Sequence, residues 1–383
     1  MRQAISADFI FDGSALRRDC AVVIEDTEIA AIMPRRELAA ALPRRDLPAG
    51  AWLAPGFIDV QVNGGGDVLF NDAPTPETIA RIAAAHRRFG TTALLPTLIS
   101  DTPAKMRAAS AAVRETAAAM PGVLGIHFEG PFLAPERAGV HDKAMFRIPD
   151  DEDLALLCAP RPGVTLVTLA PERVPPGFIA ALRGAGVRVA LGHSRATYAE
   201  ARAAIAEGLT GFTHLFNAMP AMTAREPGPV AAALDEPGAF YGLIVDGEHV
   251  APAMLHLALR GAGRGMLVTD AMPPVGGTSQ RFMLAGKEIQ VRDGRCTTAD
   301  GTLAGSALDM ASAVRNCVRL LGLELPAALA LASAAPAEFL GLGHRLGRIA
   351  PGCRADLVAL DPAELHILAT WVAGAGDSEA PPA

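Results

Sequence analysis

Short apolar runs alternate with segments of helical periodicity through the middle of the chain. Between the runs, apolar residues recur every three or four positions, for example at 76–89, 103–120 and 196–207. This alternation of strands and helices predicts a parallel sheet. Eight such runs favour a (β/α)8 barrel over an open doubly wound sheet. The runs lie at 57–62, 92–98, 123–128, 164–169, 187–191, 211–213, 240–245 and 266–269.

The segments outside the eight runs predict a second, smaller unit. Residues near both termini read as short strands, with Asp12-Gly13 and Gly352 at turn positions, and together they predict a small β-sandwich domain. Two helices, at 308–321 and 326–340, are expected to close the barrel, and a hairpin at 282–298 is expected after the eighth strand. The predicted boundaries are 1–52 and 345–373 for the β domain, 53–344 for the barrel and 374–383 for a disordered tail.

The composition and charge of the chain exclude several classes of protein. The 383 residues carry a formal net charge of −7, which argues against nucleic acid as a partner and requires any anionic substrate to be held by a local cluster. We expect no membrane span, because no run of 18 apolar residues occurs, and no secretory signal at the N-terminus. Five scattered cysteines without a C-x-x-C pair predict a reducing, cytoplasmic location and no cysteine metal site.

Ionisable side chains stand at the ends of several apolar runs. Glu129, His193, His214 and Asp270 each follow a different run. In a (β/α)8 barrel the carboxyl ends of the strands form one face, and active sites lie there. Two imidazoles and one carboxylate are typical of a catalytic zinc site that keeps a position open, and iron(II) accepts the same ligands. The pattern therefore predicts a divalent metal held by Glu129, His193 and His214.

Asp270 and His127 each have two interpretations. Asp270 could cap a helix or take a proton from a water bound to the metal. Met272-Pro273-Pro274 follows instead of a helix, which favours the general base. His127 shares a strand face with Glu129, because residues two apart in a strand point the same way. We expect His127 either to support the ligands or to pack in the interior.

Four residues are candidates for substrate capture: His141, Asn217, Arg225 and His249. Arg225 lies in a loop rich in Pro and Gly, close after the run that ends at His214. A loop arginine is usually solvated, but it could also bind a phosphate or carboxylate through two hydrogen bonds. Each of the four is weak evidence by itself.

Several motifs resemble the amidohydrolase superfamily. The segment 55–64 carries Gln61-x-Asn63 where most members have His-x-His. Together with Glu-Gly-Pro-Phe from Glu129 and His-Leu-Phe-Asn-Ala-Met-Pro from His214, this replacement resembles the N-acetylglucosamine-6-phosphate deacetylase family. The resemblance spans about residues 50–360.

The resemblance implies a role for each candidate residue. Glu129, His193 and His214 would bind the metal, Asp270 would be the acid/base, and His141 would orient or polarise the acetamide. The remaining candidates would hold the sugar phosphate: Asn217, the backbone at Ala218, Arg225 and His249. Since Gln61 and Asn63 replace two histidines, one metal per chain is implied. A homodimer is also implied, because the phosphate site of this family can draw on a neighbouring subunit.

The expected reaction is hydrolysis of N-acetyl-D-glucosamine 6-phosphate to D-glucosamine 6-phosphate and acetate, a step of amino-sugar catabolism. The nearest alternative is the galactosamine epimer, which differs at one hydroxyl that the motifs do not resolve. A cyclic amidase such as a dihydroorotase usually needs His-x-His and two metals. A sugar-phosphate binding protein without catalysis, which would hold no metal, is the alternative from another class.

Overall fold

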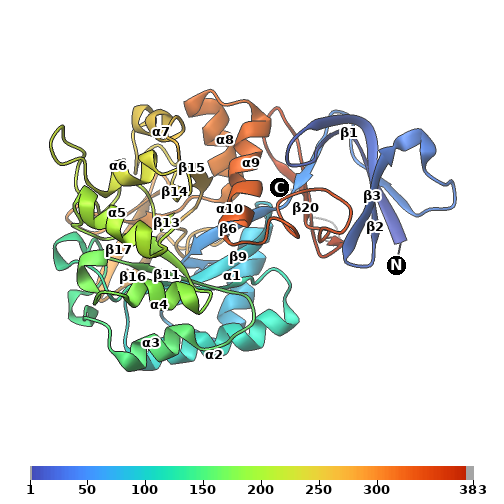
Figure 1. Cartoon of the computed structure of the whole chain (residues 1–383). Helices are drawn as coiled ribbons and strands as arrows, with labels where there is room; N and C mark the ends of the chain where they lie inside the picture. Colours follow the sequence, from blue (N-terminus) through green and yellow to red (C-terminus); the bar gives the residue numbers. More distant parts are fainter. Residues whose placement is uncertain (1, 377–383) are drawn as a thin grey trace.

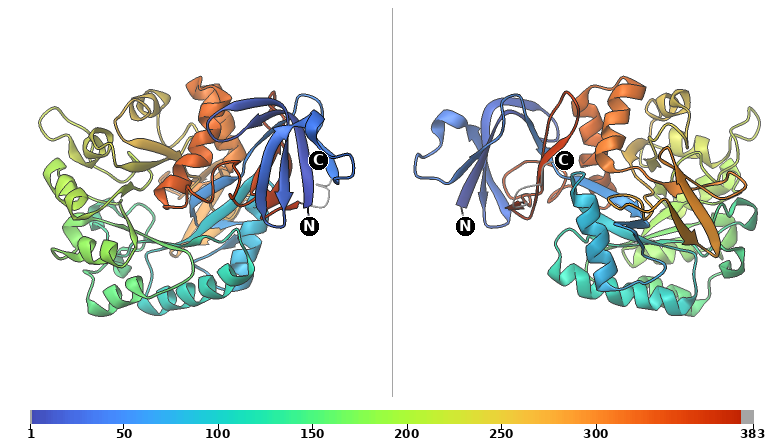
Figure 2. Two further views of the ribbon diagram at one scale, coloured as in Figure 1. Left: turned by 45° about the vertical axis from the view of Figure 1, so that its right-hand side comes forward. Right: turned by 180° about the vertical axis from the view of Figure 1, so that it is seen from behind.

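The structure is a computed structural model that describes residues 2–376. A barrel of strands and helices forms its larger part, and a β sheet built from both ends of the chain lies at one side (Figures 1 and 2). Of the segment predicted to be a tail, residues 377–383 lie outside the described residues. Residues Ala375–Gly376 pair with the preceding strand as β22.

Eight parallel strands form the barrel, and the predicted fold class is confirmed. Their hydrogen-bonded order is β15-β14-β13-β12-β11-β10-β9-β6. Every residue of β6 and β9 is buried, because barrel strands are covered on both faces and so read as continuous apolar runs. The strands are β6 (Phe57–Val62), β9 (Thr91–Ile99), β10 (Gly125–Glu129), β11 (Val164–Leu169), β12 (Arg188–Leu191), β13 (Gly211–Phe212), β14 (Phe240–Leu243) and β15 (Arg264–Leu267).

The carboxyl end of β6 is joined to the segment that follows β15, at a junction that we call the seam. The backbone N–H of Asp270 donates to the carbonyl of Gln61 (3.0 Å), and that of Asn63 donates to the carbonyl of Ala271 (2.9 Å). Val62 and Ala271 form a parallel bridge there. The seam therefore closes the barrel through the segment that carries Asp270.

Several of the helices begin where the sequence places a side-chain cap. Thr75, Thr102 and Thr197 each accept a hydrogen bond from the backbone N–H three residues on, which satisfies a donor that the helix leaves free. The helices of the barrel are α1 (Pro76–Arg87), α2 (Pro103–Ala119), α3 (Asp151–Cys158), α4 (Phe178–Gly184), α5 (Tyr198–Glu207), α6 (Gly228–Asp235), α7 (Pro252–Ala258), α8 (Met310–Leu321), α9 (Leu325–Ala332) and α10 (Ala334–Phe339).

Two sequence predictions about this region were wrong in detail. The second closing helix, expected at 326–340, is divided at Ser333, whose φ of −131° and ψ of −71° interrupt the helix between α9 and α10. The hairpin expected at 282–298 is instead an antiparallel sheet of four strands. It is anchored to the seam, because Ser306 and Ala271 form a bridge. Its strands are β16 (Arg281–Leu284), β17 (Lys287–Arg292), β18 (Arg295–Thr297) and β19 (Leu303–Ser306).

The ends of the chain meet in one sheet, in the order β22-β21-β20-β5-β1-β2-β3, with β4 paired to β1. These strands thus form one hydrogen-bonded sheet, whereas a β-sandwich would divide them between two sheets. Ile5, Leu53 and Trp371 belong to a buried core of its own, separate from that of the barrel. The strands are β1 (Arg2–Phe11), β2 (Leu16–Glu25), β3 (Glu28–Pro34), β4 (Arg44–Asp46), β5 (Trp52–Pro55), β20 (Leu357–Leu360), β21 (Ile367–Val372) and β22 (Ala375–Gly376).

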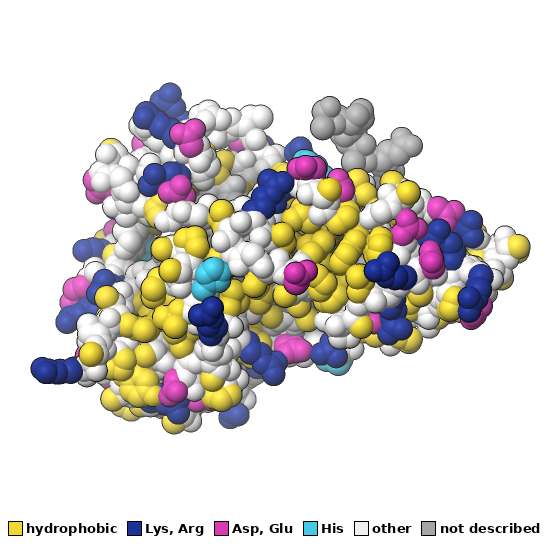
Figure 3. Space-filling view, turned by 90° about the horizontal axis from the view of Figure 1, so that it is seen from above, with side chains coloured by type: hydrophobic (Ala, Val, Ile, Leu, Met, Phe, Trp, Pro, Cys, Tyr) yellow, Lys and Arg dark blue, Asp and Glu magenta, His cyan; other side chains and the backbone are white. Residues whose placement is uncertain are grey.

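The surface is uneven in polarity. The face seen from above carries a broad hydrophobic area, with charged side chains gathered mainly around it (Figure 3). Two of the large hydrophobic side chains that are exposed in the described chain are Leu257 on α7 and Leu320 on α8. Within residues 2–376, no helix is long and apolar enough to span a membrane.

Candidate active site

Four ionisable residues come together at the carboxyl ends of the barrel strands. Glu129 is the last residue of β10, His193 and His214 each lie two residues beyond their strands β12 and β13, and Asp270 lies three beyond β15. All four are at least nine-tenths buried. Because parallel strands end at one face of the barrel, positions far apart in the sequence become neighbours there.

Three of these residues adopt a left-handed backbone conformation that residues other than glycine rarely take. The φ angles are +48° at His193, +33° at His214 and +51° at Asp270. Each such residue costs on the order of 1–3 kcal/mol, and such outliers gather at functional sites. Hydrogen bonds hold the turns, for example from the N–H of Leu215 to the carbonyl of Gly242 (2.8 Å). No signal in the sequence announces these turns.

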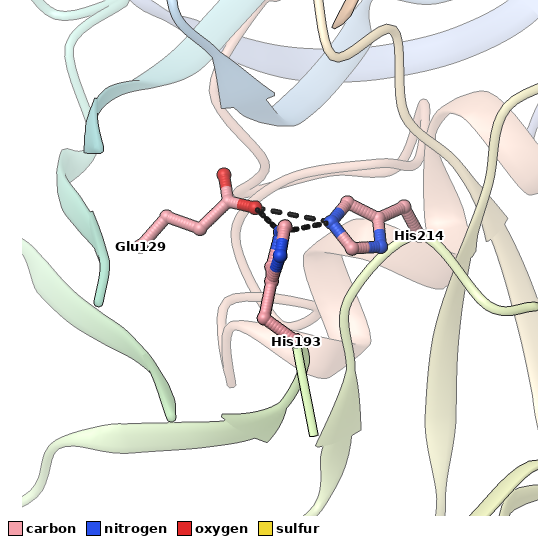
Figure 4. Close-up of side chains that lie close together, drawn as sticks. All are labelled: Glu129, His193 and His214. Carbon is pink, nitrogen blue, oxygen red and sulfur yellow. Dashed lines mark hydrogen bonds and ion pairs between the residues drawn. The ribbon is translucent and has the colours of Figure 1, made fainter. Parts of the chain in front are cut away.

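The side chains of Glu129, His193 and His214 converge on one point (Figure 4). Oε1 of Glu129 lies 3.0 Å from Nε2 of both histidines, and the two Nε2 atoms are 3.0 Å apart. Ligand atoms about 2.0–2.1 Å from a tetrahedral zinc lie about 3.3–3.4 Å from one another. The three atoms are therefore spaced nearly as a bound divalent ion requires.

The protonation of His193 also fits a metal. Its Nδ1 lies 2.7 Å from the backbone carbonyl of Arg137, and since a carbonyl can only accept, Nδ1 must carry the hydrogen. A neutral His193 then directs the lone pair of Nε2 at the carboxylate of Glu129, which is repulsive unless a cation lies between them. A carbonyl partner on Nδ1 is also how proteins fix a ligating imidazole.

Gln61 and Asn63 hold the two carboxylates by hydrogen bonds. The Gln61 amide donates to Oε2 of Glu129 (3.1 Å) and to Oδ1 of Asp270 (3.1 Å), and the Asn63 amide donates to Oδ1 of Asp270 (2.6 Å). Burial and the charge of Glu129 raise the pKa of Asp270 to about 6. Asp270 is thus a carboxyl whose pKa lies near neutral pH, as proton transfer requires.

His141 presents a hydrogen-bond donor to the same site. Its Nδ1 accepts from the hydroxyl (2.9 Å) and more distantly from the N–H (3.4 Å) of Ser100, so the ring hydrogen lies on Nε2. That Nε2 is 3.9 Å from Oε1 of Glu129. Burial and the neighbouring His193 lower the pKa of His141 to about 3, which keeps the ring neutral.

His127 lies inside the barrel instead of at the site. Its Nε2 is 2.7 Å from Oγ1 of Thr168, and its Nδ1 is 3.0 Å from the carbonyl of Val60. Burial lowers its pKa to about 4. Of its two interpretations, the structure favours a packed interior residue.

A cavity of about 320 Å³ opens above the converging side chains. Asn217 turns its amide N–H toward the carbonyl of His214 (3.2 Å), and Nδ1 of His249 is 2.6 Å from Asp246. Neither Gln61 nor Arg225 lines the cavity. The predicted site residues that do are Asn63, Glu129, His141, His193, His214, Asn217, Ala218, His249 and Asp270.

Comparison with known proteins identifies the family of this chain. A model of the amidohydrolase family matches residues 52–379. The chain belongs to the amidohydrolase family. The resemblance seen in its motifs is thereby confirmed.

Relatives of this amidohydrolase carry two related names. It is 46% identical over 327 residues to an N-acetylgalactosamine-6-phosphate deacetylase of Shewanella sp., covering 84% of this chain and 82% of the relative. It is 34% identical over 379 residues to an N-acetylglucosamine-6-phosphate deacetylase of Haemophilus influenzae, covering 98% of this chain and 99% of the relative.

Solved structures match the whole chain of the amidohydrolase. The N-acetylglucosamine-6-phosphate deacetylase from Pasteurella multocida superposes with a TM-score of 0.95 at 35% identity, covering 99% of this chain and 100% of that one. An aspartate-to-alanine mutant of the Mycobacterium smegmatis enzyme, in complex with N-acetyl-D-glucosamine-6-phosphate, superposes with a TM-score of 0.88 at 36% identity, covering 98% and 99%. The family and the cluster of Glu129, His193 and His214 together suggest a divalent metal.

Several residues lining the cavity of this amidohydrolase were missed from the sequence. Arg137 lines it from the turn after β10, and Thr302, Leu303 and Gly305 line it from strand β19 and the residue before it. Glycine-rich and polar loop segments carry no signal of where they fold back. Arg225 was expected at the substrate, but it is exposed in a loop closed by hydrogen bonds between Thr223 and Glu226.

Proposed function

We propose that this amidohydrolase hydrolyses the acetamide of N-acetyl-D-glucosamine 6-phosphate to give D-glucosamine 6-phosphate and acetate. The observation that carries the proposal is the convergence of Glu129, His193 and His214 beside Asp270 in one cavity. Relatives that cover nearly the whole chain, including the Haemophilus and Pasteurella proteins, bear the name of this activity.

In the proposed reaction, Asp270 moves one proton. It accepts a hydrogen from the attacking water, whose oxygen forms a bond to the acetyl carbon. It then delivers that hydrogen to the sugar nitrogen as the C–N bond breaks, so that the products are acetate and the free amine. His141 can donate its Nε2 hydrogen to the acetyl oxygen, where negative charge develops. Gln61 and Asn63 keep Asp270 oriented, because their side-chain amides donate two hydrogen bonds to its Oδ1.

We propose one zinc ion per chain, with iron(II) as the alternative, held by Glu129, His193 and His214. Such an ion supplies Lewis acidity and lowers the pKa of water to about 7. Gln61 and Asn63 offer neutral amides, which are poor ligands for a second ion of this kind. Elemental analysis of the purified protein tests the proposal: about one ion per chain is expected, and two firmly held ions would contradict it.

The activity assay uses the purified, metal-loaded protein with N-acetyl-D-glucosamine 6-phosphate. Acetate and a free amine should be released in equal amounts, and chelation of the metal should stop their release. Binding of the sugar phosphate without release of acetate would refute the proposal and would favour a binding protein.

N-acetyl-D-galactosamine 6-phosphate is the second candidate substrate. The relative from Shewanella, which carries that name, is more similar in sequence (46%) than the Haemophilus relative (34%). The two sugars differ in the orientation of one hydroxyl, so kcat/KM measured for both on the same preparation decides between them. A higher value for the galactosamine epimer would reassign the substrate while leaving the proposed chemistry intact.

We propose further that the chain acts as a homodimer in the cytoplasm. The broad hydrophobic area in Figure 3 supports self-association, because large apolar patches on a surface mark interaction sites. Arg225, exposed in its own chain, would then be available to a neighbouring subunit. The five cysteines are free, which suits a reducing compartment. Light scattering during gel filtration tests the dimer, and a monomer at micromolar concentration would contradict it.

A further inference from the structure

One strongly basic residue of the described chain lines the cavity of the active site. Among the described residues that line it, Glu129, Glu136 and Asp270 are acidic, and Arg137 alone is an arginine or lysine. A sugar phosphate brings up to two further negative charges into this space. Since the chain as a whole is negatively charged, attraction for such a substrate must come from a local cation.

Arg137 is fixed through its backbone and free at its side chain. It ends the short turn Pro135–Arg137, and its N–H donates to the carbonyl of Ala134 (2.9 Å). Its own carbonyl accepts from Nδ1 of His193 (2.7 Å). Within the described chain, the guanidinium has neither a hydrogen bond nor an ion pair, and Arg137 as a residue is half-buried and lines the cavity.

The neighbouring charges are paired elsewhere. Glu136 forms an ion pair with Arg195 (2.9 Å), and both of these side chains are exposed. Arg225 lies on an exposed loop outside the cavity lining. Among the described residues, Arg137 is therefore the one arginine or lysine that this chain itself places at the cavity.

We propose that the guanidinium of Arg137 binds the 6-phosphate of the substrate. The inference rests on the proposed function for the identity of the sugar phosphate. A guanidinium presents its N–H groups in a planar fork that matches two phosphate oxygens, an arrangement that lysine does not reproduce. Arg137 would thus hold the ligand His193 through its carbonyl and the substrate through its side chain, so that one turn sets the distance between them.

The test compares Arg137→Gln with wild type and with Arg107→Gln. Arg107 is exposed on α2 and does not line the cavity. Its variant therefore makes the same change of charge away from the active site. We expect Arg137→Gln to raise the KM for the sugar phosphate about 10-fold or more, the usual cost of a hydrogen bond to a charged group. The kcat should change less than KM, and Arg137→Lys should recover part of the loss.

Metal content separates this role from a structural one. The backbone carbonyl that holds His193 survives the substitution, so Arg137→Gln should retain its full content of metal. An unchanged KM, or a loss of metal together with activity, would overturn the proposal.

Inorganic phosphate tests the anion site independently of turnover. Calorimetric titration of the metal-loaded proteins with phosphate should show binding to wild type and Arg107→Gln, and binding weakened about 10-fold or more in Arg137→Gln. If wild type binds phosphate through Arg137 but releases no acetate, the proposed function fails and the anion site stands. If wild type releases acetate but phosphate binding is absent or insensitive to Arg137→Gln, the inference about Arg137 fails alone.

Discussion

Replacing Asp270 by asparagine should abolish most of the activity while leaving the site assembled. Oδ1 of Asp270 accepts hydrogen bonds from Gln61 (3.1 Å) and Asn63 (2.6 Å), and asparagine keeps an oxygen that can accept both. Asn also tolerates the left-handed backbone that Asp270 adopts. What the variant loses is the capacity to take up a proton. General acid–base catalysis contributes about 10²–10⁴-fold, or about 3–5 kcal/mol of activation free energy.

The assay measures kcat for the sugar phosphate together with metal content and the melting temperature. Asp293→Asn is a matched control, because Asp293 is exposed and also has a positive φ, +49°. We expect the control to retain wild-type kcat, and Asp270→Asn to lose at least about 100-fold. Near-normal turnover of Asp270→Asn with its metal in place would refute the assignment of Asp270 as the acid/base.

Three further outcomes are expected. Glu129→Gln should lose both metal and activity, as measured by elemental analysis and acetate release, because a neutral amide replaces the one carboxylate that contacts both histidines; retention of both would contradict the ligand set. Changing Gln61 and Asn63 together to histidine should raise the metal bound above one ion per chain, and an unchanged stoichiometry would show that these amides do not limit it. Asp59, fully buried, has a pKa raised to about 7 by burial, so the native state binds a proton that the unfolded chain releases near pH 4. Stability should therefore fall as pH rises from about 4 to 7, by up to about 4 kcal/mol, and urea midpoints should show a shallower fall in Asp59→Asn; equal slopes would refute this.

The sequence predicted the barrel well because each strand carries its own signal. Strands buried on both faces, such as β6 and β9, are apolar throughout and can be recognised without knowledge of their partners. The rule that barrel strands end at one face then placed Glu129, His193 and His214 together. That rule gives the shared face, whereas the convergence of their ligand atoms in the structure also needs the turns with positive φ at His193 and His214.

The parts that the sequence did not reveal depend on contacts between distant segments. The turn at Ser333 and the extra strands after β15 form against neighbours that no local pattern specifies. Arg137 reaches the cavity because a short turn folds back over β12 and is bound there by His193. Arg225 is exposed in its own chain, so its role at the phosphate stays a prediction that depends on a neighbouring subunit.

Enzymatic activity should depend on the local stability of the seam between β6 and β15. Strands β10, β12 and β13, which lead to the proposed metal ligands, are hydrogen-bonded to a neighbour on both sides, whereas β6 and β15 are the two ends of the strand order. Asp270 lies in the few bonds that join those ends. Proteins open first where the fewest bonds hold them, so a transient opening of the barrel would displace the acid/base while the ligands stay in register. In mild denaturant, turnover should then decline before the metal is released and before the bulk of the chain unfolds.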